Sequence, residues 1–256
     1  MSPDADAVLA RRLIGLLDLT NLESNCGPAE IKALTARALG PPASVAAVCL
    51  WPQFVGEAAR ALKDSGVTVA TVINFPAGGE DLERVLEDMD EALDDGADEI
   101  DLVLPYRAVL RGETQIASDM IRESKGIVGQ GRLLKVILET GAMPDMETVA
   151  AASRLAIAAG ADFLKTSTGK IAVSATPEAA GTMLAEIARA GRPVGFKAAG
   201  GIRTLADAAL YLRLAEEAMG AGWATRDTFR IGASSLHAAL ATVIVGEPVA
   251  PGKGSY

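Results

Sequence analysis

The sequence predicts an α/β protein built as a single (β/α)8 TIM barrel with a short N-terminal helix. Eight short β-like runs recur along the 256 residues, segments with helical periodicity separate them, and glycines mark the ends of several helices. Alternation of strands and helices with a period of about 30 residues is typical of βαβ units, and therefore of a parallel sheet.

The predicted strands are aliphatic, as expected for a parallel sheet covered by helices on its outer face. They are Leu13–Thr20, Ser44–Leu50, Val67–Phe75, Glu99–Leu104, Leu133–Thr140, Asp162–Thr166, Pro193–Ala198 and Phe229–Gly232. Glu80–Leu93, Met146–Ala159 and Thr176–Ala190 have helical periodicity, and Thr-Pro opens the last of these helices.

Glycines precede four of the predicted strands. Gly66, Gly96, Gly160 and Gly191 each stand where a helix should end, so we expect left-handed caps there. An open doubly wound sheet is the alternative fold, but no Gly-x-Gly-x-x-Gly follows the first strand.

No linker divides the chain. No proline-rich segment or shift in composition interrupts it, so we expect one domain over residues 1–256, with residues 247–256 a flexible C-terminal tail.

Composition narrows the class of protein. The net charge of −9 argues against a nucleic-acid partner, and no apolar run is long enough to span a membrane. Asp4 and Asp6 stand where a secretory signal would be basic, so we expect none. Two cysteines make a disulfide framework improbable, so we expect a cytoplasmic protein.

Charged residues interrupt the predicted strands, although a barrel covers both faces of each strand. They are Asp18, Asp101, Lys135, Glu139, Lys165 and Lys197. Because side chains alternate along a strand, aliphatic neighbours should face the helices and these residues the barrel interior. Active sites of this fold lie at the carboxyl ends of the strands.

Two interpretations of the buried charges remain open. One is a structural network of ion pairs, although desolvating so many charges costs several kcal/mol per ion. The other is an activated amine, since Lys165 and Lys197 lie on adjacent strands. One of these two lysines would stay protonated and lower the pKa of the other toward neutrality, as burial also does.

Several kinds of chemistry lack their usual residues. His237 is the sole histidine and lies in a predicted helix, so a zinc-dependent aldol mechanism lacks its ligands. No dinucleotide fingerprint supports hydride transfer. We therefore expect carbonyl chemistry through an imine, with no metal and no organic cofactor.

Glycine-bearing segments follow the last three strands: Thr168-Gly169-Lys170, Gly200-Gly201 and Gly232-Ala233-Ser234-Ser235. Backbone N–H groups and helix N-termini at such loops bind anions, which predicts a phosphate site. The alternative is that they are ordinary turns with a serine N-cap.

Motifs along nearly the whole chain resemble the deoxyribose-phosphate aldolase family. They are Leu17-Asp18-Leu19-Thr20, Glu99-Ile100-Asp101, Pro105-Tyr106, the segment Leu134–Thr140, Phe163-Leu164-Lys165-Thr166-Ser167-Thr168-Gly169-Lys170, Gly195-Phe196-Lys197 with Gly200-Gly201, and the segment Phe229–Ser235. The resemblance implies a (β/α)8 barrel that interconverts 2-deoxyribose 5-phosphate with acetaldehyde and glyceraldehyde 3-phosphate, often as a homodimer.

The resemblance also implies roles for individual residues. Lys165 would form the Schiff base, Lys197 would lower its pKa, and Asp101 would be a general acid/base. Lys135 and Asp18 would support their hydrogen bonds. The phosphate would contact Gly169, Lys170, Gly200, Gly201, Gly232, Ser234 and Ser235, and the substrate pocket would include Thr20, Cys49 and Thr168.

Two residues have a weaker assignment. Some family members end in a tyrosine that reaches the active site, which would give Tyr256 a catalytic role, whereas a glycine-rich terminus is by default disordered. Cys49 ends the second predicted strand and either lines the pocket or is a packed core thiol.

Three other functions share some of these features. The lysines and phosphate loops alone would also suit a transaldolase-like or keto-sugar aldolase. A non-catalytic sugar-phosphate sensor and a phosphosugar isomerase are the further alternatives. Imine trapping on a lysine would separate the aldolases from both.

Overall fold

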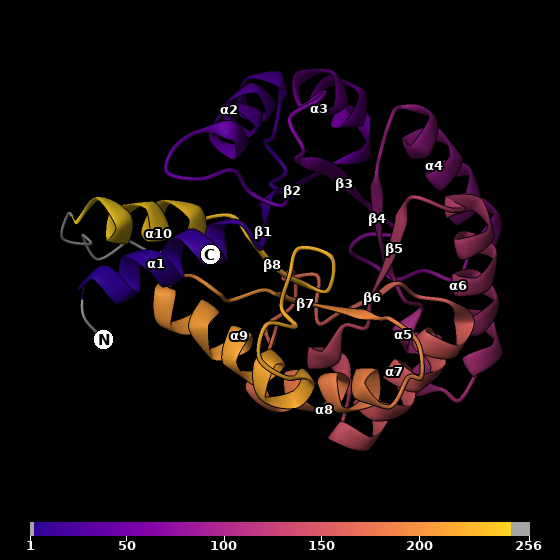
Figure 1. Cartoon of the computed structure of the whole chain (residues 1–256). Coiled ribbons are helices and arrows are strands. Elements are labelled where there is room, and N and C mark those ends of the chain that lie inside the picture. Colours follow the sequence, from indigo (N-terminus) through magenta and orange to yellow (C-terminus); the bar gives the residue numbers. More distant parts are fainter. Residues whose placement is uncertain (1–2, 247–256) are drawn as a thin grey trace.

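Eight parallel strands close into one barrel in the computed structural model, which describes residues 3–246 (Figure 1). Each strand pairs with its neighbour in chain order, and β8 pairs with β1. The strands are β1 (Leu17–Asn21), β2 (Ala47–Leu50), β3 (Thr68–Ile73), β4 (Glu99–Val103), β5 (Leu133–Ile137), β6 (Phe163–Lys165), β7 (Gly195–Ala199) and β8 (Phe229–Ala233). The predicted fold class is confirmed.

Helices surround the barrel, and α1 packs beside α10 (Figure 1). The α-helices are α1 (Pro3–Ile14), α2 (Pro28–Leu39), α3 (Val55–Ala61), α4 (Leu82–Asp94), α5 (Tyr106–Leu110), α6 (Thr114–Val128), α7 (Met146–Ala159), α8 (Pro177–Ala188), α9 (Leu205–Met219) and α10 (Leu236–Val245). Two short 3-10 helices are η1 (Pro52–Phe54) and η2 (Thr140–Ala142). The predicted tail 247–256, with Tyr256, lies outside the described residues.

Local signals account for several helix ends. The carboxylates of Asp81 and Asp145 and the hydroxyl of Thr176 accept the backbone N–H three residues on, at the starts of α4, α7 and α8. Helix α7 has the predicted bounds and ends at Gly160, whose φ is 110°. All four glycines predicted as caps have positive φ, but only Gly160 is itself the C-cap of its helix. Gly96 directly follows the C-cap of α4, whereas Gly66 and Gly191 lie in turns beyond the C-caps of α3 and α8, where the cap prediction was wrong.

Several predicted strand ends were wrong, including the start of β2, which begins at Ala47 instead of Ser44. The errors at β1 and β5 have a common cause. Leu13 and Ile14 belong to α1, because they continue its buried helical face rather than the strand. Strand β5 ends at Ile137, and Glu139 adopts a left-handed conformation (φ 56°) that leads into η2. In both places an apolar run crosses an element boundary, so hydrophobicity alone does not mark it.

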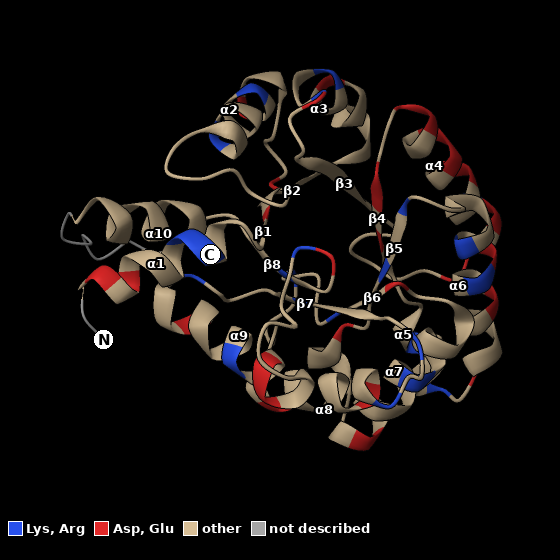
Figure 2. Cartoon of the chain, viewed as in Figure 1, with Lys and Arg blue, Asp and Glu red and all other residues tan. Residues whose placement is uncertain are grey.

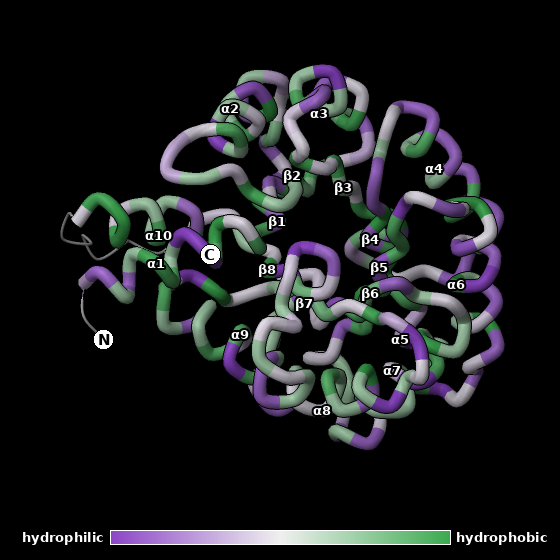
Figure 3. The backbone as a smooth tube through the Cα atoms, in the orientation of Figure 1, coloured by the Kyte–Doolittle hydropathy of each residue, from purple (hydrophilic) through white to green (hydrophobic). Residues whose placement is uncertain are grey.

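The two faces of the barrel wall differ in polarity. Outward residues such as Ile100 and Phe196 are fully buried in one large core shared with the helices, and hydrophobic segments follow the strands (Figure 3). Charges on β4 and β5 lie inside the ring of helices, apart from those on the outer helices (Figure 2). The alternation predicted from the sequence is confirmed for β4 and β7.

None of the helices in residues 3–246 combines the length and the apolar character needed to cross a membrane.

Candidate active site

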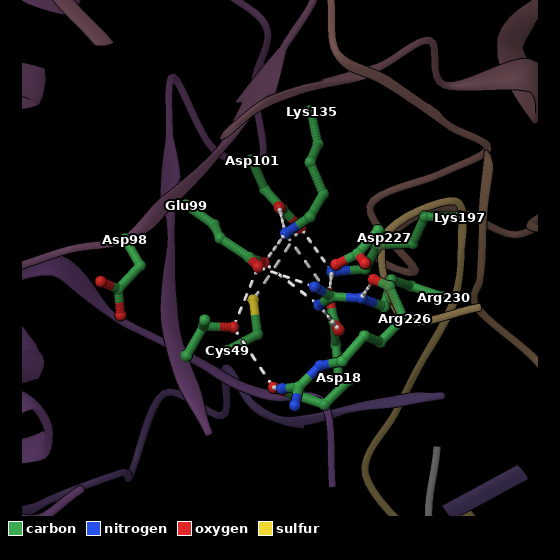
Figure 4. A network of polar contacts seen from close by, with 12 residues as sticks. Asp18, Cys49, Asp98, Glu99, Asp101, Lys135, Lys197, Arg226, Asp227 and Arg230 are labelled. Carbon is green, nitrogen blue, oxygen red and sulfur yellow. Dashed lines mark hydrogen bonds and ion pairs between the residues drawn. The ribbon is translucent and has the colours of Figure 1, made fainter. Parts of the chain in front are cut away.

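Seven charged side chains from six strands meet inside the barrel, and we call them the ion cluster. They are Asp18 on β1, Glu99 and Asp101 on β4, Lys135 on β5, Lys165 on β6, Lys197 on β7 and Arg230 on β8. None is more than 4% exposed. Figure 4 shows six of them converging from different strands. Alternation along the strands places them here, since each is an inward position in its strand.

The three lysines of the ion cluster differ in how many carboxylates they contact. The Nζ atom of Lys135 lies 3.1 Å from Asp101 Oδ1 and 3.5 Å from Asp18 Oδ2, and it also bonds Glu99. The Nζ atom of Lys197 lies 2.5 Å from Asp18 Oδ2 and 2.7 Å from Asp101 Oδ2.

Within residues 3–246, Lys165 makes a single ion pair, 2.7 Å from Nζ to Asp101 Oδ2. This is the same oxygen that Lys197 contacts. The two amines therefore share one carboxylate oxygen, as their pairing in the register of β6 and β7 favours.

These contacts shift the lysine pKa values in opposite directions. Burial lowers the pKa of Lys165; Asp101 opposes this, Lys197 adds to it, and the pKa ends below its usual value. Burial acts the same way on Lys197, but Asp101 and Asp18 outweigh it and raise its pKa. Burial raises the pKa of Asp101, yet the three lysines hold it well below its usual range.

Small residues leave room for these side chains. A Cβ atom added at Gly232 would lie 3.0 Å from Lys197 Cε, and one at Gly195 would lie 2.4 Å from the ring of Phe163. Gly232 therefore gives Lys197 its space, in addition to the phosphate role that the sequence predicts.

A cavity of about 790 Å³ opens above the ion cluster, at the carboxyl ends of β1, β6, β7 and β8. Lys165 is the cluster member that lines it. The structure brings together there all the residues predicted for the phosphate site, with two predicted for the substrate pocket. They are Gly169, Lys170, Gly200, Gly201, Gly232, Ser234, Ser235, Thr20 and Thr168.

The cavity loops have backbone conformations that favour glycine. Gly169, Gly200 and Gly201 have φ of 77°, 92° and 82°, which favours glycine. A Cβ atom at Gly200 would lie 2.5 Å from Ser174 Cβ. Ser235 precedes α10 without capping it through its side chain, so its hydroxyl and the helix N-terminus both adjoin the cavity.

Cys49 lies among the inward side chains of β2, fully buried, with Sγ 4.0 Å from Asp101 Oδ2. Burial raises the pKa of its thiol. It packs in a small apolar cluster with Leu22, Ala70 and Val72, next to the ion cluster and outside the lining of the cavity.

Glu139 was predicted among the inward residues of the fifth strand, and this was wrong because the strand ends before it. Its Oε2 accepts the hydroxyl of Thr168 at 2.5 Å, and its Oε1 accepts the Thr168 N–H at 3.3 Å. Glu139 therefore holds the loop that follows β6. Burial raises its pKa, although the bonds from Thr168 oppose the shift.

Several charged residues near the site were missed at the level of sequence, among them Glu23 and Arg203 of the cavity lining. Glu99 and Arg230 belong to the ion cluster, and alternation with Asp101 and Gly232 on their strands was the signal that could have identified them. Arg37, on α2, lines the cavity. Nothing local in the sequence connects α2 with the loops after β7 and β8. His237 is buried in α10 away from the cavity lining.

The chain matches known proteins over most of its length. The model of the family described as DeoC/LacD family aldolase matches residues 12–242. A protein of Agrobacterium fabrum named deoxyribose-phosphate aldolase is 48% identical over 244 residues, covering 95% of this chain and 94% of its own.

Two solved structures also resemble the chain. A putative deoxyribose-phosphate aldolase from Coccidioides immitis is 28% identical, with a TM-score of 0.81, over 91% of this chain and 85% of its own. The apo form of a putative deoxyribose-phosphate aldolase from Toxoplasma gondii is 25% identical, with a TM-score of 0.87, and the match covers 95% of this chain and 99% of its own. On the family match and the Agrobacterium relative, this chain belongs to the DeoC/LacD family of aldolases.

Proposed function

We propose that the protein catalyses the reversible cleavage of 2-deoxy-D-ribose 5-phosphate into acetaldehyde and D-glyceraldehyde 3-phosphate, through an imine on Lys165. The observation that carries this proposal is the position of Lys165: within the ion cluster, it is the residue that lines the cavity closed by the glycine loops. The substrate follows from the name of the Agrobacterium relative.

Imine formation needs a neutral amine. The Nζ atom of Lys165 attacks C1 of the open-chain aldehyde, and water leaves to give an iminium ion. The positive charge forms beside Asp101 Oδ2, which lies 2.7 Å from Nζ. Because three lysines keep the pKa of Asp101 low, this group is a carboxylate that stabilises the iminium charge.

The iminium then accepts the electrons of the C2–C3 bond. The C3 hydroxyl loses its proton, the bond breaks, and glyceraldehyde 3-phosphate leaves with a new C3 carbonyl. C1 and C2 remain on Lys165 as an enamine, which is protonated at C2 and hydrolysed to acetaldehyde. Asp101 and Lys197 transfer these protons, directly or through water, and Asp101 Oδ2 lies 2.7 Å from Lys197 Nζ. Lys135 holds Asp101 in place and Asp18 holds Lys197, each through an ion pair.

The phosphate binds at the loops after β6, β7 and β8. Backbone N–H groups of Gly169, Gly200, Gly201 and Gly232 and the hydroxyls of Ser234 and Ser235 contact its oxygens, and the N-terminus of α10 adds a favourable dipole. Lys170 supplies charge from the cavity wall.

Borohydride reduction in the presence of 2-deoxyribose 5-phosphate or acetaldehyde, followed by peptide mass mapping, tests the mechanism. We expect a reduced adduct on Lys165 in the wild type and none in Lys165→Ala. Lys63→Ala, which removes an exposed lysine outside the cavity lining, is the matched control and should keep the adduct.

Three outcomes would contradict the proposal. An adduct on Lys197 or Lys135 would keep an imine mechanism but reject the nucleophile. Absence of any adduct, with substrate bound, would reject the imine. Faster cleavage of ketose phosphates than of 2-deoxyribose 5-phosphate would instead reject the substrate. The homodimer is a separate prediction of the resemblance, which the molecular mass in solution measures.

A further inference from the structure

Arg230 and Glu99 form the floor of the ion cluster, away from the cavity. Arg230 Nη1 lies 2.6 Å from Asp18 Oδ1, and its Nη2 lies 2.8 Å from Glu99 Oε1. Each of these two residues is only 2% exposed, and neither lines the cavity. They are thus placed too deep to touch a substrate, and the mechanism proposed above gives them no role.

The ion cluster contains three carboxylates and four basic groups. The carboxylates are Asp18, Glu99 and Asp101, and the basic groups are Lys135, Lys165, Lys197 and Arg230. A net charge enclosed in a protein interior is costly, so the cluster is most stable when one basic group is neutral. Arginine does not lose its proton in proteins.

The contacts decide which lysine is neutral. Among the carboxylates of the described part of the chain, Lys135 touches three, Lys197 two and Lys165 one. Lys165 therefore holds its proton least strongly, by the count of opposite charges that it contacts.

Two ionisable groups outside the ion cluster also face Lys165, and neither is altered by a change at Arg230 or Glu99. Cys49 on β2 is a thiol whose pKa is raised by burial, and the charge of Glu139 beyond β5 interacts with that of Lys165 while its carboxylate bonds Thr168. The inward residues of β3 near it, Ala70 and Val72, carry no charge. We infer that Arg230 and Glu99 are positioning residues that set the protonation of Lys165 by fixing the charge balance of the ion cluster.

Opposite effects follow from removing the two partners of one ion pair. Without the Arg230 cation the cluster has a surplus negative charge, which favours the protonated form of Lys165. Its protonation midpoint then rises. Without the Glu99 carboxylate there is a surplus positive charge, and the midpoint falls. A unit charge removed about 10 Å away, at an effective dielectric of about 20, shifts a pKa by about one unit.

The test measures the rate of borohydride-trapped acetaldehyde adduct on Lys165 as a function of pH, on the full chain. We expect the acid midpoint to rise by about one pH unit in Arg230→Gln and to fall in Glu99→Gln. The double variant removes both charges and should return the midpoint to within about 0.3 units of the wild type. Arg230→Lys keeps the charge, loses the fork of hydrogen bonds, and should leave the midpoint in place.

A purely structural role would lower yield or stability in these variants without moving the midpoint in opposite directions. Shifts of the same sign, or none, in folded variants would overturn the inference. If Arg230→Gln does not fold, Glu99→Gln and the double variant still decide. The acid midpoint must fall in Glu99→Gln and must return to the wild-type value in the double variant. The inference rests on the proposed function, in which Lys165 is the nucleophile. The wild-type protein is measured first, and the absence of an adduct there would reject the proposed function rather than the inference.

Discussion

The ion cluster and the cavity above it both carry cations, but different groups surround those cations. In the cluster, Lys135, Lys197 and Arg230 are buried against carboxylates. At the cavity wall, Arg37, Lys170 and Arg203 are exposed and have no ion pair with a described carboxylate. The buried charges set proton affinity in a dry interior, while the exposed ones attract an anion through solvent. Substitutions in the two regions should therefore change different kinetic constants.

The largest effect should come from the centre of the ion cluster. Asp101→Asn removes the carboxylate that contacts all three lysines, and we expect kcat to fall by about 10³-fold with a smaller change in KM. Steady-state kinetics with 2-deoxyribose 5-phosphate measures both constants. Asp98→Asn is the matched control, since Asp98 immediately precedes β4 and accepts the Val69 N–H outside the cluster. A loss confined to KM would contradict the division between the regions.

Acid should destabilise the ion cluster before it affects the cavity wall. The pKa values of Asp18, Glu99 and Asp101 are lowered on folding, because the neighbouring cations outweigh the effect of burial. Their contribution to the free energy of unfolding is complete above the unfolded pKa of about 4 and is lost as pH falls through the folded values.

We therefore expect the free energy of unfolding to fall progressively below pH 4, by on the order of 2 kcal/mol for each such carboxylate. Urea unfolding followed by circular dichroism between pH 3 and pH 6 measures this. The loss should be smaller in the Glu99→Gln/Arg230→Gln double variant, which lacks one buried pair. A flat profile down to pH 3 in the wild type would show that the cluster contributes nothing to stability.

The same division explains what the sequence could predict. Lys165, Lys197 and Asp101 were identifiable because a charge inside an aliphatic strand is conspicuous, and the glycine loops because each follows a strand. Glu99 lies at the first position of its strand, where a charge reads as part of the preceding turn. Arg230 was missed because it lies in a short predicted strand that leads directly into a glycine loop. Its partner Asp18 is 212 positions away, and such a pairing depends on barrel closure.

The cavity wall should respond through KM. Lys170 lines the cavity, and its Nζ donates to the carbonyl of Leu22 at 2.9 Å. Lys170→Ala should raise KM for 2-deoxyribose 5-phosphate about tenfold, because a charge-assisted contact to phosphate is worth roughly 1.5 kcal/mol, and leave kcat nearly unchanged. Non-phosphorylated deoxyribose should show no such difference. Lys63→Ala is the control, and an equal loss with both sugars would assign Lys170 to holding the loop.

Arg37 should give the smallest effect and the clearest dependence on salt. It reaches the cavity from α2, and burial followed by the charge of Arg37 lowers the pKa of His237 at the start of α10. Its field therefore acts where the phosphate is proposed to bind. Arg37→Ala should raise KM about two- to threefold at low ionic strength and not at all near 1 M salt, where the screening length is about 3 Å. Arg213→Ala, which removes an arginine on α9 paired with Glu217, is the control and should leave KM unchanged at both salt concentrations. A salt-independent rise in KM would mean that Arg37 contacts the phosphate directly, which would place it with Lys170 rather than with the more distant charges of the wall.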